Sequence, residues 1–315
     1  GGGPGMKALL PLVILLAAGV ALSALVGPMG SGAPWSVIVS LRLSRTALAV
    51  LAGASLAVAG AVLQTVLRNV LATPYTLGVS AGAGLSAGVV ILFGTGLSGY
   101  WSNLAGTAGA LAATAVTASL AGRRWSDGST LILAGVTVNV LGASLLLALE
   151  YISPASRLME IVRWMMGDLA AAGYSRPLYL LPFTLAGLLT VLPRSGILNQ
   201  MLAGEELAES RGVNTRRERA LMLTAAAVLA GGAVGAVGPV GFVGLVVPHI
   251  LRRVSGGDLR RLLPLSALGG AVLLVWSDVL SRVVVSPGEL PIGIITALLG
   301  GPYFLYLLGS GEGDQ

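Results

Sequence analysis

Long uncharged apolar stretches dominate this chain and restrict it to one class of fold. The first runs from Ala8 to Val26, directly after the only lysine, Lys7, and is long enough to cross a bilayer as a helix. Hydrophobic residues make up 55% of the chain and charged residues 10%, and the mean hydropathy is +0.88. Soluble globular domains do not have this composition. The sequence therefore predicts an all-α integral membrane protein.

Ten transmembrane helices are predicted, because Gly, Pro and Arg residues interrupt the apolar sequence repeatedly. The predicted spans cover residues 8–26, 46–67, 77–93, 103–121, 130–151, 178–193, 220–236, 241–254, 262–283 and 292–308. A signal peptide is the alternative for the first stretch, but its length favours a membrane span. Residues 6–315 are expected to form a single transmembrane domain, and the leading GGGPG (residues 1–5) is interpreted as an expression scar.

The basic residues predict the orientation. With the amino terminus inside, thirteen of the nineteen Lys and Arg residues fall in segments on the inner side. Cytoplasmic segments of membrane proteins carry such an excess. We therefore expect both termini in the cytoplasm, since the number of spans is even. The basic residues are scattered through loops, so no nucleic-acid partner is predicted.

The segment 199–218 concentrates charge in an otherwise apolar chain. Gly204 can precede a short helix whose first turn holds Glu205 and Glu206, where carboxylates favour the positive end of the helix dipole. Gly212 suits the left-handed position that ends such a helix, and a capping box from Thr215 to Glu218 is expected to begin the next one. This cytoplasmic segment is either a solvated loop or a docking surface for another protein.

A second non-spanning helix is predicted on the outer side, at about residues 156–169. Apolar residues recur there at helical spacing, while charged residues lie elsewhere on the helical wheel. The apolar positions are Leu158, Ile161, Val162, Met165, Met166 and Leu169. We expect this amphipathic helix to lie on the outer membrane face.

The rare residue types limit the chemistry. Cysteine is absent and His249 is the only histidine, so the sequence offers no disulfide, no cysteine metal site and no multi-histidine site. A Walker A motif needs a lysine directly after a glycine, and Lys7 does not follow one. No cofactor or metal is therefore expected on this chain, and ATP chemistry would have to reside on another chain.

Several motifs together resemble one family. They are LRLSR (41–45), GAVLQTVLRNVLATPYTLGVSAGAG (60–84), LILAGV (131–136), GEELAESRGVN (204–214), GPVGFVGLVVPHILR (238–252) and ELPIGIITALLGGPYFLYLL (289–308). The chain resembles the membrane permease subunits of bacterial ABC importers for ferric siderophores, haem and vitamin B12. The resemblance implies ten helices per subunit, a homodimer with the pathway on its axis, and a location in the inner membrane. It also implies a periplasmic binding protein and two cytoplasmic ATPase subunits that bind ATP and Mg²⁺.

The resemblance also implies roles for particular residues. Contact with the ATPase is implied for Glu205, Glu206, Leu207, Ala208, Arg211, Gly212 and Val213, docking of the binding protein for Arg42, Arg45 and Arg282, and a cytoplasmic gate for Asn69, Leu71 and Ser129. Two positions depart from the family's usual proline, Ser44 and Val70. Lipid headgroups are the alternative partners of the outer arginines, and Asp278 and Arg282 have the i,i+4 spacing of a helical ion pair.

Two polar residues inside predicted spans, Gln64 and Asn139, either line the pathway or bond to neighbouring helices. An ion-coupled secondary transporter is the main alternative function, but such proteins keep ionisable groups near the bilayer midplane. Here Glu150 and Asp278 fall near the outer ends of their spans. A membrane enzyme would need a cluster of catalytic side chains, which the sequence does not contain. An importer permease is therefore the predicted function, and the sequence does not distinguish iron chelates, haem and corrinoids as cargo.

Overall fold

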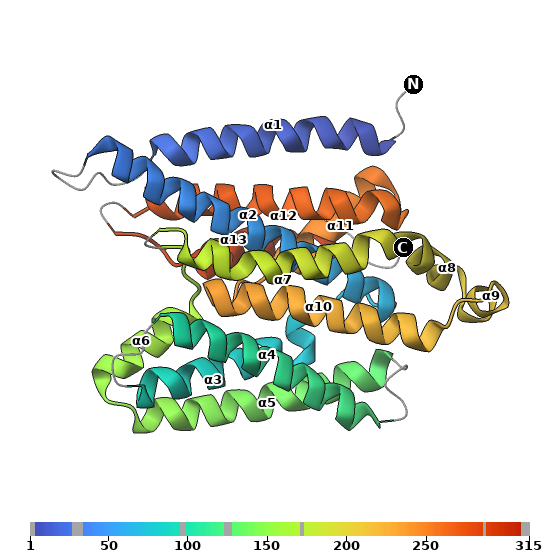
Figure 1. Cartoon of the computed structure of the whole chain (residues 1–315), viewed down its shortest axis with the longest axis horizontal. Helices are drawn as coiled ribbons and strands as arrows, with labels where there is room; N and C mark the ends of the chain where they lie inside the picture. Colours follow the sequence, from blue (N-terminus) through green and yellow to red (C-terminus); the bar gives the residue numbers. More distant parts are fainter. Residues whose placement is uncertain are drawn as a thin grey trace.

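The structure is a computed structural model that describes residues 4–26, 34–94, 99–122, 128–170, 173–285 and 288–309. The regular elements within these ranges are all helices (Figure 1). They are α1 (Pro4–Leu25), α2 (Trp35–Val66), η1 (Pro74–Leu77), α3 (Val79–Phe93), α4 (Tyr100–Ala121), α5 (Gly128–Ile152), α6 (Ala155–Met165), α7 (Ser175–Val191), η3 (Leu192–Arg194), α8 (Ser195–Ala203), α9 (Glu205–Ser210), α10 (Thr215–Val237), α11 (Val243–Ser255), α12 (Leu259–Val283) and α13 (Ile292–Gly309). Pro4 and Gly5, the last two residues of the stretch interpreted as an expression scar, begin α1.

Within the residues that the structure describes, seven helical segments are long and apolar enough to cross a membrane. They are Ala8–Leu25, Trp35–Val66, Tyr100–Ala121, Gly128–Ile152, Ser175–Ala203, Thr215–Val237 and Leu259–Val283, with Val79–Phe93 and Ile292–Tyr306 as shorter apolar helices. The all-α multi-pass fold is thus confirmed, and every predicted span coincides with a helix. The number of ten crossings stays a prediction, since α11 has only 13 residues.

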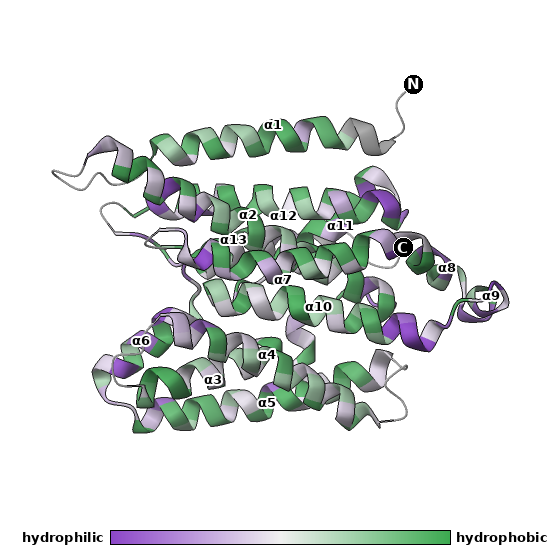
Figure 2. Cartoon of the chain, in the orientation of Figure 1, coloured by the Kyte–Doolittle hydropathy of each residue, from purple (hydrophilic) through white to green (hydrophobic). Residues whose placement is uncertain are grey.

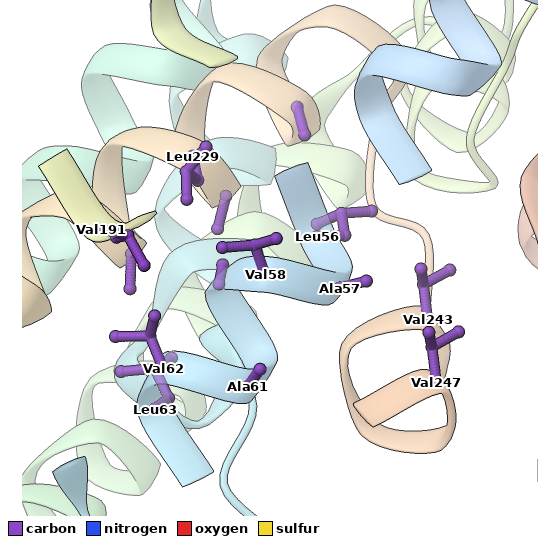
Figure 3. Close-up of a cluster of buried hydrophobic side chains, with 14 of the residues drawn as sticks. Leu56, Ala57, Val58, Ala61, Val62, Leu63, Val191, Leu229, Val243 and Val247 are labelled. Carbon is purple, nitrogen blue, oxygen red and sulfur yellow. The ribbon is translucent and has the colours of Figure 1, made fainter. Parts of the chain in front are cut away.

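The bundle is organised around α2 and α10. In each of these helices 78% of the most apolar window is buried inside the chain, against 17% in α1 and in α5. Figure 3 shows side chains of α2 between Val191 of α7 and Leu229 of α10 on one side and Val243 and Val247 of α11 on the other. Central helices bury most of their surface in protein, whereas α1 and α5 keep broad apolar faces outside.

Glycines let α2 approach two other helices closely. A Cβ atom on Gly53 would overlap the carbonyl oxygen of Gly270 in α12, and one on Gly60 would overlap that of Gly244 in α11. Only glycine fits where two helix backbones meet at this distance. Gly53 thus marks a close contact between α2 and α12.

Helix α2 begins eleven residues before the predicted span at 46–67, and the predicted outer loop that carries Arg42 and Arg45 is helical. The predicted span begins only after Arg45, because charged side chains are costly inside a membrane. The helix continues through them because partners within the chain receive both guanidinium groups, as described below.

The two ends of the bundle are polar and its middle is apolar. Figure 2 shows hydrophilic colour at α9 and the start of α10 at one end, and around α6 at the other. Helix α1 begins at the end of the bundle that holds α8 and α9 (Figure 1). Helix α6 confirms the predicted helix near 156–169, although it ends at Met165. Its position on the outer membrane face stays a prediction.

Candidate coupling and gate site

Helix α9 lies beyond the end of the bundle, next to α8 (Figure 1). Gly204 precedes it with a φ of 144° and Gly212 follows it with a φ of 83°, backbone angles that L side chains rarely adopt. The N–H of Val213 donates to the carbonyl oxygen of Ala208 at 3.0 Å and closes the end of the helix. The predicted short helix between two glycines is confirmed.

The residues implied in ATPase contact divide into two groups. Leu207 is 42% exposed, whereas Ala208 is fully buried and faces the bundle. Glu206, Arg211 and Gly212 are also exposed, and Glu205 and Val213 are half-buried. A partner could therefore touch Leu207 and its exposed neighbours, while Ala208 holds α9 against the rest of the chain. The contact role of the whole set stays a prediction.

The predicted capping box at the start of α10 is wrong by one residue. Asn214 is the N-cap, and its side-chain oxygen accepts a hydrogen bond from the N–H of Arg217 at 3.0 Å. The hydroxyl group of Thr215 donates instead to the Glu209 carboxylate at 2.5 Å. This bond ties α9 to the first turn of α10, so the turn between them is short and well connected.

Glu205, the first residue of α9, joins three parts of the chain. Its carboxylate accepts a hydrogen bond from the buried Arg219 of α10. The guanidinium group of Arg68, just after α2, lies 3.8 Å from the same carboxylate oxygen. Arg68 also donates to the carbonyl oxygen of Met201 in α8 at 2.9 Å. The protruding helix is therefore anchored at its N-terminal end.

The candidate gate residues lie in segments that contact each other. Asn69 and Leu71 follow α2 in a turn where the Asn69 side-chain oxygen accepts from the N–H of Leu71 at 2.8 Å. Ser129 is the second residue of α5. The residue before it, Gly128, packs so closely that a Cβ atom there would lie 2.8 Å from the carbonyl oxygen of Leu67. The structure thus brings together the two segments that carry these residues, and the gate role of the residues stays a prediction.

The three outer arginines are turned into the chain. Arg42 is buried and donates to the carbonyl oxygen of Ala24 at 2.9 Å. Arg45 donates to Asp278 at 2.5 Å and to Glu289 at 2.6 Å. Arg282 is also buried, and its partners are Asp278, the Ser23 hydroxyl and carbonyl oxygens, and the Val26 carbonyl oxygen. Docking of a binding protein on these residues stays a prediction, and the structure gives each of them an internal partner.

Gln64 and Asn139, considered for the pathway, both bond to the backbone of other elements. The amide of Gln64 is buried and donates to the carbonyl oxygen of Gly244 at 3.2 Å. The amide of Asn139 donates to the carbonyl oxygen of Tyr75 at 2.6 Å. These contacts connect α2 to α11 and α5 to η1. Pathway lining by either residue stays a prediction.

The sequence does not reveal a cavity of about 500 Å³ at the end of the bundle that holds α6. Its lining includes Asn103, Glu160, Arg163, Arg176 and Glu289. The only signal in the sequence was the set of charged residues around the predicted outer helix. Their convergence depends on how α4, α6 and α10 pack, which no local pattern specifies.

Within the described part of the chain, no three acidic or histidine side chains lie close enough to hold a metal ion. The described helices define a multi-pass membrane bundle with a charged helix, α9, protruding from one end. The chain belongs to the FecCD transport family, which it matches over residues 8–310.

Relatives in this family include named permeases. The chain is 39% identical over 286 residues to the hemin transport system permease protein HmuU of Yersinia pestis, covering 88% of this chain and 84% of HmuU. It is 37% identical over 269 residues to the vitamin B12 import permease BtuC of Vibrio cholerae, covering 85% of this chain and 81% of BtuC. A solved structure of a metal-chelate type ABC transporter in an inward-facing conformation matches with a TM-score of 0.88 and 30% identity, over 96% of this chain and 99% of that one.

Proposed function

We propose that this chain is the permease subunit of an ATP-driven importer that carries an iron chelate, haem or a corrinoid from the periplasm to the cytoplasm by alternating access. The observation that carries the proposal is the nearly full-length similarity to permeases named for hemin, vitamin B12 and Fe(3+)-citrate. The similarity to an inward-facing transporter of metal chelates supports the same function. An ion-coupled secondary transporter is not favoured by these relatives.

The proposed assembly contains two copies of this chain, two cytoplasmic ATPase subunits and a periplasmic binding protein. It lies in the bacterial inner membrane with both termini in the cytoplasm. A separate ATPase is supported by the lack of a Walker lysine and by the exposed Leu207 on the protruding α9. The permease itself is proposed not to hydrolyse ATP, and ATP and Mg²⁺ would bind to the ATPase subunits.

The test uses the exposed apolar side chain of α9. Leu207→Glu places a charge where an apolar contact is proposed, and it should abolish co-purification with the ATPase and uptake of the cargo. Leu207→Met keeps the apolar surface and serves as the matched control. Both variants should melt at the wild-type temperature in detergent, because the side chain is not part of the core. Unchanged co-purification of Leu207→Glu would remove α9 from the proposed interface.

Docking of the binding protein at the opposite end is proposed as well. Of the three outer arginines, Arg45 is the one whose partner, Glu289, is partly exposed, at 32% of its side chain. A carboxylate from a docking protein could replace Glu289 there, since guanidinium groups hold carboxylates by paired hydrogen bonds. Glu289→Gln would remove the competing charge, so we expect tighter binding of the periplasmic protein at low salt. Weaker or unchanged binding would contradict docking at Arg45.

A further inference from the structure

Arg68 occupies a backbone position that normally favours glycine. Its φ is 48°, so it is one of two non-glycine residues with positive φ in the described ranges. The N–H of Arg68 donates to Thr65 at 3.3 Å and the N–H of Asn69 donates to Gln64 at 3.1 Å. These are the two hydrogen bonds of a Schellman motif, in which the residue with positive φ is usually glycine. An arginine here costs conformational energy that a glycine would avoid.

The side chain of Arg68 spans the space between three helices. Its Nη2 atom donates to the carbonyl oxygen of Met201 at 2.9 Å, in the last turns of α8. The same atom lies 3.8 Å from the Glu205 carboxylate at the start of α9. The side chain of Arg68 thus reaches from the end of α2 to the α8–α9 junction. The backbone cost thus accompanies a specific contact between α2 and the junction.

The contact is strong on one side of Glu205 and weak on the other. Arg219 of α10 is 6% exposed and bonds directly to Glu205, which fixes the carboxylate relative to α10. Arg68 is 51% exposed and Glu205 39% exposed, so their ion pair is screened by water and contributes little stability. A weak ion pair can lengthen or break when the junction moves. The pair of Arg68 and Glu205 therefore fits a contact that changes between conformations rather than one that only stabilises the fold.

Arg68 is also the direct neighbour of the candidate gate. Asn69 follows it and orders the turn through its bond to the N–H of Leu71. Leu67, before it, packs against the first residue of α5, Gly128. Arg68 therefore belongs to the backbone segment that contains the candidate gate residue Asn69 and contacts the start of α5 through Leu67.

We propose that Arg68 is a positioning residue that transmits displacement of the α8–α9 junction to the turn at residues 67–73. This inference rests on the proposed function, because α9 would be displaced by the ATPase. The side chain is the transmitting part. It connects the Met201 carbonyl oxygen and the Glu205 carboxylate to the turn after α2. A glycine in place of Arg68 would keep the backbone hydrogen bonds of this turn but would lack these two side-chain contacts.

The first experiment measures transmission in the permease–ATPase complex in nanodiscs. Because the chain contains no cysteine, Val70→Cys gives a single labelling site beside the candidate gate residues. We expect ATP with orthovanadate to change its rate of reaction with N-ethylmaleimide when Arg68 is present. Arg68→Gly and Arg68→Ala should both lose this response while the complex still forms and hydrolyses ATP.

Two further measurements separate the effect of the Arg68 side chain from that of its backbone and of nearby charge. Arg216→Ala removes an exposed arginine of α10 from the same end of the molecule and should keep the response. Arg68→Gly relieves the backbone strain and should melt at or above the temperature of Arg68→Ala. If Arg68→Gly keeps the response, the side chain is not needed for transmission and the inference is overturned, whether or not Arg68→Ala keeps it.

The second experiment needs no ATPase and so separates this inference from the proposed function. Spin labels on Val70→Cys and Ser210→Cys report the distance between the turn and α9 in the permease alone. We expect a broader distance distribution in Arg68→Gly than in the protein with Arg68. An unchanged width would show that Arg68 does not hold the two segments together. Failure of the proposed function would appear instead as an ATPase that does not bind the unmodified chain.

Discussion

In α12, the Nη2 atom of Arg282 lies 2.7 Å from the Oδ2 atom of Asp278, one helical turn earlier, and the side chains are 3% and 1% exposed. The other carboxylate oxygen of Asp278 accepts a hydrogen bond from Arg45 of α2. One buried carboxylate therefore pairs with two arginines and joins α12 to α2. The i,i+4 spacing predicted the first contact, whereas nothing in the sequence indicated the second.

Asp278→Asn should strongly destabilise the chain, because it leaves two guanidinium groups in a buried site with one negative charge fewer. Breaking a buried ion pair on one side costs about 3–5 kcal/mol. Replacing both partners of the i,i+4 pair with Leu should cost less, since Arg45 keeps Glu289 as a partner. Thermal unfolding in detergent measures both effects. A double variant less stable than Asp278→Asn would contradict this account.

Gly270→Ala should destabilise the contact between α12 and α2. Its new Cβ atom would overlap the carbonyl oxygen of Gly53, which belongs to a helix backbone and cannot move aside easily. Overpacking of this kind costs about 1–3 kcal/mol. Gly257→Ala is the matched control, because a Cβ atom there would meet no other atom within 4 Å. The melting temperature should fall for the first variant and stay unchanged for the second, and equal shifts would refute the close approach.

We expect the folded chain to lose stability at acid pH when Asp258 becomes protonated. Its carboxylate caps α12 and accepts hydrogen bonds from the N–H of Arg260 at 3.0 Å and the amide of Asn199 at 2.6 Å. These bonds, with the N–H of Arg260 contributing most, hold the pKa of Asp258 below its usual value. A lowered folded-state pKa gives a stabilisation that is fully present above the unfolded-state pKa, about 3.9, and is lost as the pH falls through the folded-state value.

The corresponding variant is Asp258→Asn. It can still cap the helix, but it no longer titrates, so its melting temperature should fall less than that of the wild type between about pH 6 and about pH 3. Asp258→Ala removes the cap and should cost about 1 kcal/mol at neutral pH. Parallel pH profiles for the wild type and Asp258→Asn would show that the carboxylate contributes nothing to the acid sensitivity.

Single cysteines test the proposed orientation. Ser210 in α9 and Ser156 in α6 are both exposed and lie at opposite ends of the bundle. Ser210→Cys should react with a membrane-impermeant maleimide only in inverted vesicles, and Ser156→Cys only in intact spheroplasts. The reverse pattern would invert the topology. Ser126, which precedes α5 in the sequence, lies outside the described residues.

The sequence was sufficient for features that depend on composition and on neighbouring residues. Each span predicted from hydropathy coincides with a helix, and Gly204 and Gly212 correctly marked the two ends of α9. These signals are local, because a span must be apolar along its own length and a break needs its own glycine. The error at the start of α2 arose from the same logic, since Arg42 and Arg45 look like loop residues until their partners are known.

Contacts between distant segments could not be predicted in this way. The burial of Ala208, the backbone conformation of Arg68 and the cavity beside Arg163 each depend on which helices meet and at what angle. Helical periodicity gives one apolar face for each helix but does not name the helix that covers it. The gate residues could be grouped only through the family resemblance, and the contact of Gly128 with Leu67 gives that grouping a physical basis.

The separation of Arg45 from Asp278, 233 residues along the chain, has a consequence for biosynthesis. At about 5–20 residues per second, roughly 10–50 s pass between the synthesis of the arginine and that of its carboxylate. During this interval the guanidinium group of Arg45 lacks both Asp278 and Glu289, so we expect it to stay in the polar region of the bilayer, and Gly53 of α2 has no α12 to cover it. A ribosome that stalls before Asp278 would leave a nascent chain with both features uncovered, as a substrate for membrane proteases.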